Sequence, residues 1–195
     1  MPGYRIPTTL ELAETASVIV LARVDGGIPV GPRAKDQPLT LSPVLLLKGS
    51  ALPKQIQMPG WLETRAAKAT RSDPAELAEA NPDAFDGGCN RYVFAKGMTL
   101  LLFLNPKGGR LEALNYPFAR TAEDVSAFDA RWVKAVREYV AIAALPKHLR
   151  KARLAARRDV LRSKPDADSK AIAADMDREL NAPRKALREP LPPAP

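Results

Sequence analysis

The chain has 195 residues, 46% of them apolar and 27% charged, a globular composition that excludes a wholly disordered protein. It has one cysteine, Cys89, and one histidine, His148, which excludes an intrachain disulfide and leaves too few ligands for a zinc site, so we expect no zinc. No apolar run approaches the roughly 20 residues that span a bilayer, and the net charge of +8 is concentrated in residues 146–195, which hold 13 of the 30 Lys and Arg residues.

Near the N-terminus, the spacing of Thr8 and Glu11 is typical of a capping box and predicts a helix of about two turns. Five segments then have the composition of β-strands, because each is rich in β-branched or aliphatic residues or alternates them with polar ones. Pro43 interrupts the second strand and indicates an edge or a bulge there, since proline cannot donate a ladder hydrogen bond. The predicted strands cover residues 18–24, 39–47, 55–58, 98–104 and 110–114.

Residues 61–90 separate the third strand from the fourth and are rich in alanine and charge. Ser72, Asp73 and Pro74 predict the start of a helix that runs through Ala80, so we interpret the segment as a long helical insertion between strands. Structured insertions of this length are often functional, although many only decorate their scaffold.

The most regular helical pattern begins at Thr121 and Asp124 and continues to residue 144. Its apolar side chains recur every three or four residues and predict one buried face. We expect this face, which includes Phe128 and Trp132, to pack against the β-sheet rather than to bind a ligand.

Residues 146–195 are expected to form a basic helical tail with a Pro-rich, disordered end. After Pro146, a thin apolar stripe among many cations predicts a basic amphipathic helix, and a weaker helix is predicted over residues 169–180. Such a tail can bind a protein partner or an anionic membrane surface, or it can pack on its own barrel or on a partner subunit. The candidate contact residues are Lys147, Arg150, Lys151, Arg153, Arg157, Arg158 and Arg162.

These elements together predict a mainly β protein with additional helices. The strand order, the long second connection and the terminal helix favour a five-stranded OB-like Greek-key barrel. The barrel domain would cover residues 1–145, with the insertion at 61–90 and a packed helix at 121–144, and the basic tail would cover residues 146–195.

Short motifs on this predicted barrel resemble a known family. A strand that ends in a Leu-Lys-Gly turn at residues 44–49, followed by Cys89, Phe94, Lys96-Gly97 and the aliphatic strand at residues 100–104, resembles bacterial members of the tissue-inhibitor-of-metalloproteinase-like, or netrin-like, OB-fold group. The resemblance implies a non-enzymatic binding domain in the periplasm or outside the cell. The animal inhibitors chelate the target's zinc with an N-terminal cysteine, and because Cys89 is internal, metalloproteinase inhibition does not carry over.

Two hypotheses of function follow from these patterns. The first is a cell-envelope binding or protein-interaction domain that uses the insertion and the basic tail as contact surfaces. The alternative is an OB-fold protein that binds single-stranded nucleic acid through the basic tail, for which a cytoplasmic location is expected. The net charge favours this alternative, whereas the low aromatic content of 6% does not.

No catalytic or cofactor-binding residues are predicted. Cys89 and His148 could act as nucleophile and base only if the fold brought them together, and the glycine pairs lack the spacing of phosphate-binding loops. An unrecognised hydrolase site is a third, weaker hypothesis. Arg91 and Arg120 are candidates for an anion contact near the barrel mouth, and the competing interpretation is a pair of surface salt bridges.

Overall fold

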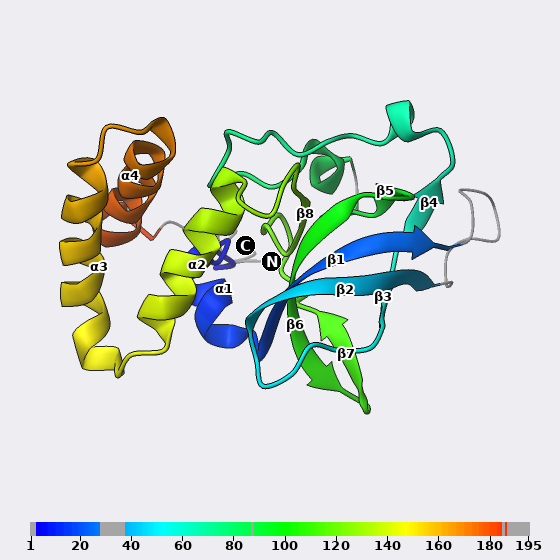
Figure 1. Ribbon diagram of the computed structural model, residues 1–195, viewed down its shortest axis with the longest axis horizontal. Helices are drawn as coiled ribbons and strands as arrows, with labels where there is room; N and C mark the ends of the chain where they lie inside the picture. The colour runs from blue at the N-terminus through cyan, green and yellow to red at the C-terminus, as the bar shows by residue number, and fades with distance from the viewer. Residues whose placement is uncertain (1–2, 28–37, 87, 185, 187–195) are drawn as a thin grey trace, which may run out of the picture.

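The computed structural model of the protein describes residues 3–27, 38–86, 88–184 and 186 (Figure 1). These residues form a mixed α/β structure in which α1 and α2 lie between an antiparallel sheet and the pair of helices α3 and α4. The strands are β1 (Val18–Gly26), β2 (Pro38–Lys48), β3 (Ile56–Pro59), β4 (Trp61–Glu63), β5 (Val93–Ala95), β6 (Thr99–Lys107), β7 (Arg110–Ala113) and β8 (Ala122–Asp124). The helices are α1 (Thr9–Thr15), α2 (Arg131–Ala143), α3 (Lys147–Arg162) and α4 (Ala167–Asn181).

The main sheet contains all five predicted strands and one strand that the sequence did not predict. Its order is β3-β2-β1-β6-β7, and β8 pairs with β6 beside β7. All its strand pairs are antiparallel, and the register of β1 against β2 shifts between Leu21 and Ala22, where Ala22 lies opposite Pro43. The irregularity expected at Pro43 is therefore present.

The sheet does not close into a barrel, which corrects the five-stranded OB-like barrel expected from the sequence. Closure requires hydrogen bonds around the whole ring of strands. The edge strands β3 and β7 approach each other, but no ladder joins them in the described part of the chain. Each has four residues, and β3 ends at Pro59, which has no N–H to donate. The result is an open sheet of six strands.

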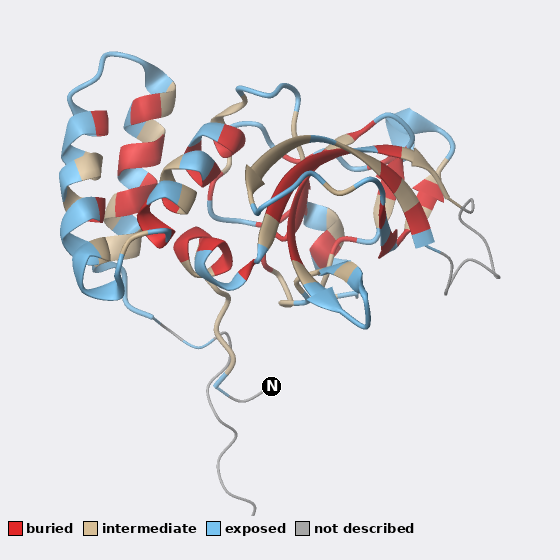
Figure 2. Cartoon of the chain, turned by 60° about the horizontal axis from the view of Figure 1, so that its bottom comes forward, coloured by how far each residue is buried: buried red, intermediate tan, exposed pale blue. Residues whose placement is uncertain are grey.

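Both faces of the sheet are buried, as Figure 2 shows for its central strands. Ile19 and Leu21 of β1 face the helices, whereas Val20 and Ala22, one residue out of phase, face a second core that includes Phe94. Because successive side chains of a strand point to opposite faces, a strand covered on both sides reads as a continuous apolar run. This explains why β1 and β6 are the most apolar segments of the sequence.

The insertion between β3 and β6 lacks the helix that the sequence predicted from Ser72 to Ala80. Its helical content is two short 3-10 turns, Ala66–Lys68 and Pro82–Phe85. One oxygen of Glu76 accepts hydrogen bonds from the backbone N–H groups of the next three residues. Side-chain acceptors of this kind satisfy backbone donors in tight turns and compete with helix formation.

The packed helix α2 begins at Arg131 rather than at Thr121, so the predicted helix at 121–144 is too long at its N-terminal end. The carbonyl of Thr121 accepts a hydrogen bond from the N–H of Phe103 at 3.2 Å, and the following residues form β8. These backbone groups are used by the sheet and cannot also form a helix. Phe128, expected on the buried face, is 53% exposed, whereas Trp132 is buried as expected.

The two helices predicted in the tail, α3 and α4, are present and pack side by side next to α2 (Figure 1). Leu154 and Leu161 of α3 and Met176 of α4 are buried in the same core cluster as Tyr139 of α2. None of the helices in the described part of the chain has the length and apolarity needed to cross a membrane. The Pro-rich end that was expected to be disordered lies outside the described residues.

Candidate functional site

Four of the seven cations predicted as contact residues on α3 form ion pairs within the protein. Lys147, Lys151 and Arg153 are exposed and have no ion pair in the described part of the chain. The four pairs are Arg150–Glu14 (2.8 Å), Arg157–Glu138 (2.5 Å), Arg158–Asp177 (3.0 Å) and Arg162–Asp177 (3.2 Å). Since these acids lie on α1, α2 and α4, much of the positive charge of α3 holds the helices together.

An exposed stripe runs along α3, and we call it the α3 stripe. It consists of Leu149, Arg153, Ala156 and Val160, which recur every three or four residues and therefore share one side of the helix. Leu149 is 47% exposed and Val160 is 49% exposed. The two exposed apolar side chains lie about three turns apart on this side of α3.

A groove with a cavity volume of about 580 Å³ lies between α2 and α3, beside the α3 stripe. Its apolar lining comes mainly from small and aliphatic side chains on both helices. Glu138 and Arg157, which also line it, neutralise each other through two hydrogen bonds of 2.6 and 2.5 Å. The lining residues are Glu138, Ala141, Ile142, Leu145, Leu149, Ala152, Arg153 and Arg157.

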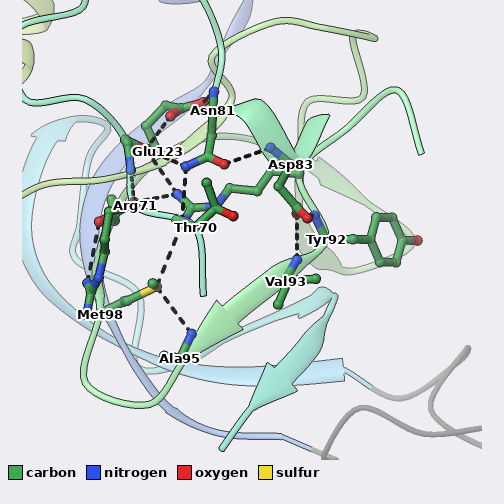
Figure 3. A network of polar contacts seen from close by, with 12 residues as sticks. Thr70, Arg71, Asn81, Asp83, Tyr92, Val93, Ala95, Met98 and Glu123 are labelled. Carbon is green, nitrogen blue, oxygen red and sulfur yellow. Dashed lines mark hydrogen bonds and ion pairs between the residues drawn. The ribbon is translucent and has the colours of Figure 1, made fainter. Parts of the chain in front are cut away.

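A buried polar network joins the insertion to the sheet (Figure 3). Nη1 of Arg91 lies 2.7 Å from a carboxylate oxygen of Asp124 on β8, and both side chains are buried. Asp124 also accepts a hydrogen bond from the backbone N–H of Ser72 at 2.8 Å. The neighbouring Glu123 accepts one from the backbone N–H of Asn81 at 3.1 Å. Burial opposes ionisation of Asp124, but Arg91 and the hydrogen bonds from Ser72 outweigh it and lower the pKa of Asp124.

A cavity of about 260 Å³ lies where α1, α4 and the insertion meet, and we call it the Arg120 cavity. Four arginines line it, and three of them have a carboxylate partner nearby. The three pairs are Arg5–Glu11 (2.5 Å), Arg178–Asp175 (2.8 Å) and Arg184–Glu179 (2.5 Å). Arg120 is 4% exposed and has no carboxylate at ion-pair distance among the described residues.

Two carboxyl groups in the lining of the Arg120 cavity have altered pKa values. Burial raises the pKa of Asp175, although hydrogen bonds from Tyr139 at 2.6 Å and from Arg178 favour its charged form. Burial likewise raises the pKa of Glu179, against the effect of Thr8 and Arg184. Burial and the adjacent Asp175 raise the pKa of the Tyr139 hydroxyl, which is therefore a hydrogen-bond donor at neutral pH.

A third concave surface, of about 650 Å³, follows the open seam between β3 and β7. Tyr92, which is 36% exposed, lines it together with Lys107 and Arg110. Lys107 pairs with Glu112 at 3.1 Å, whereas Arg110 has no ion pair in the described residues. An exposed aromatic ring beside cations is a feature of surfaces that bind single-stranded nucleic acid.

The structure places Cys89 and His148 on separate segments. The carbonyl of Cys89 accepts the N–H of Phe118 at 2.6 Å in the loop before β5, and His148 is exposed in the first turn of α3. No hydrogen bond joins the two residues in the described part of the chain. Across the same residues, no group of three or more His, Cys, Asp or Glu side chains could hold a metal ion.

The sequence singled out Arg91 and Arg120 but did not predict what surrounds them. Both were considered as surface residues near a barrel mouth, and both are buried. The Arg120 cavity was missed because its lining comes from the N-terminal segment, the insertion and α4, which are far apart in the sequence. No local pattern marks such a site.

Neither a protein-family model nor a curated protein matches the chain. The interpretation of these surfaces therefore depends on their geometry and chemistry.

Proposed function

We propose that this protein is a non-enzymatic binding domain that docks an acidic, amphipathic helix of a partner protein beside the α3 stripe, in the groove between α2 and α3. The observation that carries the proposal is the α3 stripe itself, where exposed Leu149 and Val160 flank Arg153. A groove with apolar anchors and an unpaired cation fits a helix that presents apolar side chains flanked by acids.

The charges around the groove support an acidic rather than a basic partner. Arg157 neutralises Glu138, the acid in the groove lining, so that Arg153 is left as net positive charge. Arg137, which directly precedes Glu138 on α2, is exposed and has no ion pair in the described part of the chain. Acidic side chains of a docked helix would therefore meet Arg153 in the groove lining, and Arg137 adds a further unpaired cation on α2.

Single-stranded nucleic acid is the second candidate partner, and the seam between β3 and β7 favours it. Tyr92 offers a ring for stacking and Arg110 a charge for phosphate. Counterion release makes affinity for nucleic acid depend on the number of free cations. Four of the predicted α3 cations are already ion-paired, which weakens this candidate relative to a protein partner.

The netrin-like resemblance supports a periplasmic or secreted location, and we propose this location for the protein. Fractionation of the native host, followed by the intact mass of the endogenous protein, tests the proposal. A protein found in the periplasm or the medium agrees with it, and one confined to the cytoplasm contradicts it.

Fluorescence anisotropy with a labelled amphipathic helix built from Leu and Glu tests the docking proposal. The double substitution Leu149→Ala and Arg153→Ala should weaken binding by about tenfold or more, because it removes one apolar anchor and the unpaired cation. The matched control is Leu52→Ala with Lys54→Ala, an exposed leucine and cation in the loop after β2. This control should leave binding unchanged.

Two further probes separate the possible partners. The same protein is titrated with oligo-dT and with phosphatidylglycerol vesicles at physiological salt. Tighter binding to either probe than to the acidic helix contradicts a protein partner. Equal weakening by the two double substitutions would also contradict docking at the α3 stripe.

A further inference from the structure

The Arg120 cavity has the features of a ligand site that is separate from the groove between α2 and α3. The two concave surfaces share no lining residue. At about 260 Å³ the cavity is slightly smaller than the roughly 300 to 1,000 Å³ of sites for drug-sized ligands. It therefore suits a small organic molecule rather than a nucleotide or an oligosaccharide.

The hydrogen-bonding capacity of Arg120 is only partly used. Its Nη1 donates to the carbonyl of Glu79 at 2.8 Å, and its Cζ lies 4.3 Å from the ring centroid of Trp132. Its Nε is buried without an acceptor, and no acceptor for Nη2 is present among the described residues. The Nε–Nη2 edge, one of the two edges with which a guanidinium binds a carboxylate in bidentate fashion, thus has no acceptor among the residues that the structure describes.

The carboxylates of the cavity do not supply the missing partner. Asp175 accepts hydrogen bonds from Tyr139 and Arg178, and Glu179 accepts one from Arg184. Burial lowers the pKa of Arg120, and the acids around it, Glu123 first, offset this only in part. A buried guanidinium without a direct anionic partner is costly, and a bound carboxylate would remove that cost.

We propose that the Arg120 cavity binds a small organic monocarboxylate whose carboxylate accepts hydrogen bonds from the guanidinium group of Arg120, which lines the cavity. Leu12 and Leu77 line the same cavity and provide contacts for an apolar body. A second carboxylate on the ligand is disfavoured, because Asp175 and Glu179 would repel it. The ligand class is therefore a short aliphatic or aromatic monocarboxylic acid.

Titration with sodium butyrate tests this proposal through the two indole N–H signals of the ¹⁵N-labelled protein. The chain has two tryptophans; Trp132 lies against Arg120, whereas Trp61 contacts Tyr92 instead. Butyrate should shift the Trp132 signal in a saturable manner and leave Trp61 unchanged. Butyramide, which has the same shape and no charge, should give no saturable shift, and succinate should bind more weakly than butyrate.

Two substitutions address the site directly. Arg120→Lys keeps the positive charge but removes the planar guanidinium with its several N–H donors. Butyrate should therefore bind to this variant about tenfold more weakly or worse. Ala78→Phe places a large side chain at an exposed position of the cavity lining and should also weaken binding, with no core contact removed. Arg23→Lys, at an exposed arginine on β1, is the matched control and should bind as the unaltered protein does.

Three results would overturn the proposal. They are an equal response to butyramide or to matched sodium chloride, an equal shift of the Trp61 signal, and unchanged affinity in the folded Arg120→Lys and Ala78→Phe variants. If Arg120→Lys does not fold, as judged from the dispersion of its amide signals, Ala78→Phe and the comparison of butyrate with succinate decide the question.

Discussion

Two buried arginines, Arg91 and Arg120, differ in what surrounds their guanidinium groups. Arg91 has the carboxylate of Asp124 at 2.7 Å and further donates to Thr70 and Ser72. Arg120 has a carbonyl and an aromatic ring but no carboxylate at ion-pair distance in the described residues. We therefore interpret Arg91 as part of the structural connection between insertion and sheet, and Arg120 as the residue of the pair that is available for a ligand.

Substitution of Arg91 should reveal its structural role. Arg91→Met leaves Asp124 buried without its main partner and should lower the free energy of unfolding by about 3 to 5 kcal/mol. Arg71 contacts the same carboxylate at 3.4 Å but is 55% exposed, so Arg71→Met should cost about 1 kcal/mol or less. Urea denaturation of the two variants measures the difference. Equal losses would show that burial of the pair is not what stabilises the insertion.

Among the secondary-structure elements, α4 is joined to α2 by a buried polar contact as well as by apolar packing. The hydroxyl of Tyr139 on α2 donates to Asp175 on α4 at 2.6 Å, and Met176 is buried in the shared core. Asp168, at the start of α4, accepts from Arg131 and Lys134 of α2 near the surface. The two acids thus connect the same helices in different environments.

These environments predict opposite dependences of stability on pH. Burial raises the pKa of Asp175 above 3.8, the ordinary value for an aspartate. The contribution of Asp175 to the stability of the folded protein is therefore present below about pH 3.8 and is lost as the pH rises through the folded-state pKa. Hydrogen bonds from Lys134 and Arg131 lower the pKa of Asp168, so its contribution is present above about pH 3.8 and is lost as pH falls.

Urea denaturation over a pH series checks this prediction. It compares the unaltered protein with the Asp175→Asn and Asp168→Asn variants. Relative to Asp175→Asn, the unaltered protein should gain stability as pH falls from 7 towards the ordinary range of an aspartate. Relative to Asp168→Asn, it should lose stability below that range. A pH-independent difference for Asp175→Asn would mean that burial does not govern its ionisation.

For the molecule as a whole, one core connects the sheet to all four helices. Phe103 of β6, Leu12 of α1, Tyr139 of α2, Leu161 of α3 and Ile172 of α4 belong to a single cluster of buried side chains. Helices that share a core with a sheet are expected to unfold together with it. The basic tail differs from the rest of the chain in its charge, but its helices α3 and α4 are part of this common core.

Scanning calorimetry should therefore record a single cooperative transition. Leu161→Ala on α3 removes a buried side chain and should cost about 2 to 5 kcal/mol, lowering the melting temperature by about 2 to 4 °C per kcal/mol for a chain of this size. The whole transition should move. Two transitions, with Leu161→Ala affecting just one of them, would show that residues 146–195 unfold as an independent unit.

Elements with strong local signals were predicted correctly from the sequence. The capping box at Thr8 and Glu11 is present, with both of its hydrogen bonds. The five predicted strands all belong to the main sheet, and both tail helices lie where their apolar spacing placed them. In each case the pattern is carried by residues that are close together in the sequence, and the structure contains the element that the pattern predicted.

The remaining features depend on residues that are distant in the sequence. Glu123 and Asp124 have the composition of a helix start, but their backbone pairs with β6 and their carboxylates bind Ser72, Asn81 and Arg91. The sequence by itself determined five strands of the main sheet, the helices α1, α3 and α4, and the position of the basic charge. Tertiary structure decided that the sheet stays open, which cations become ion-paired and where the Arg120 cavity forms, because each of these depends on contacts between segments that no local pattern relates.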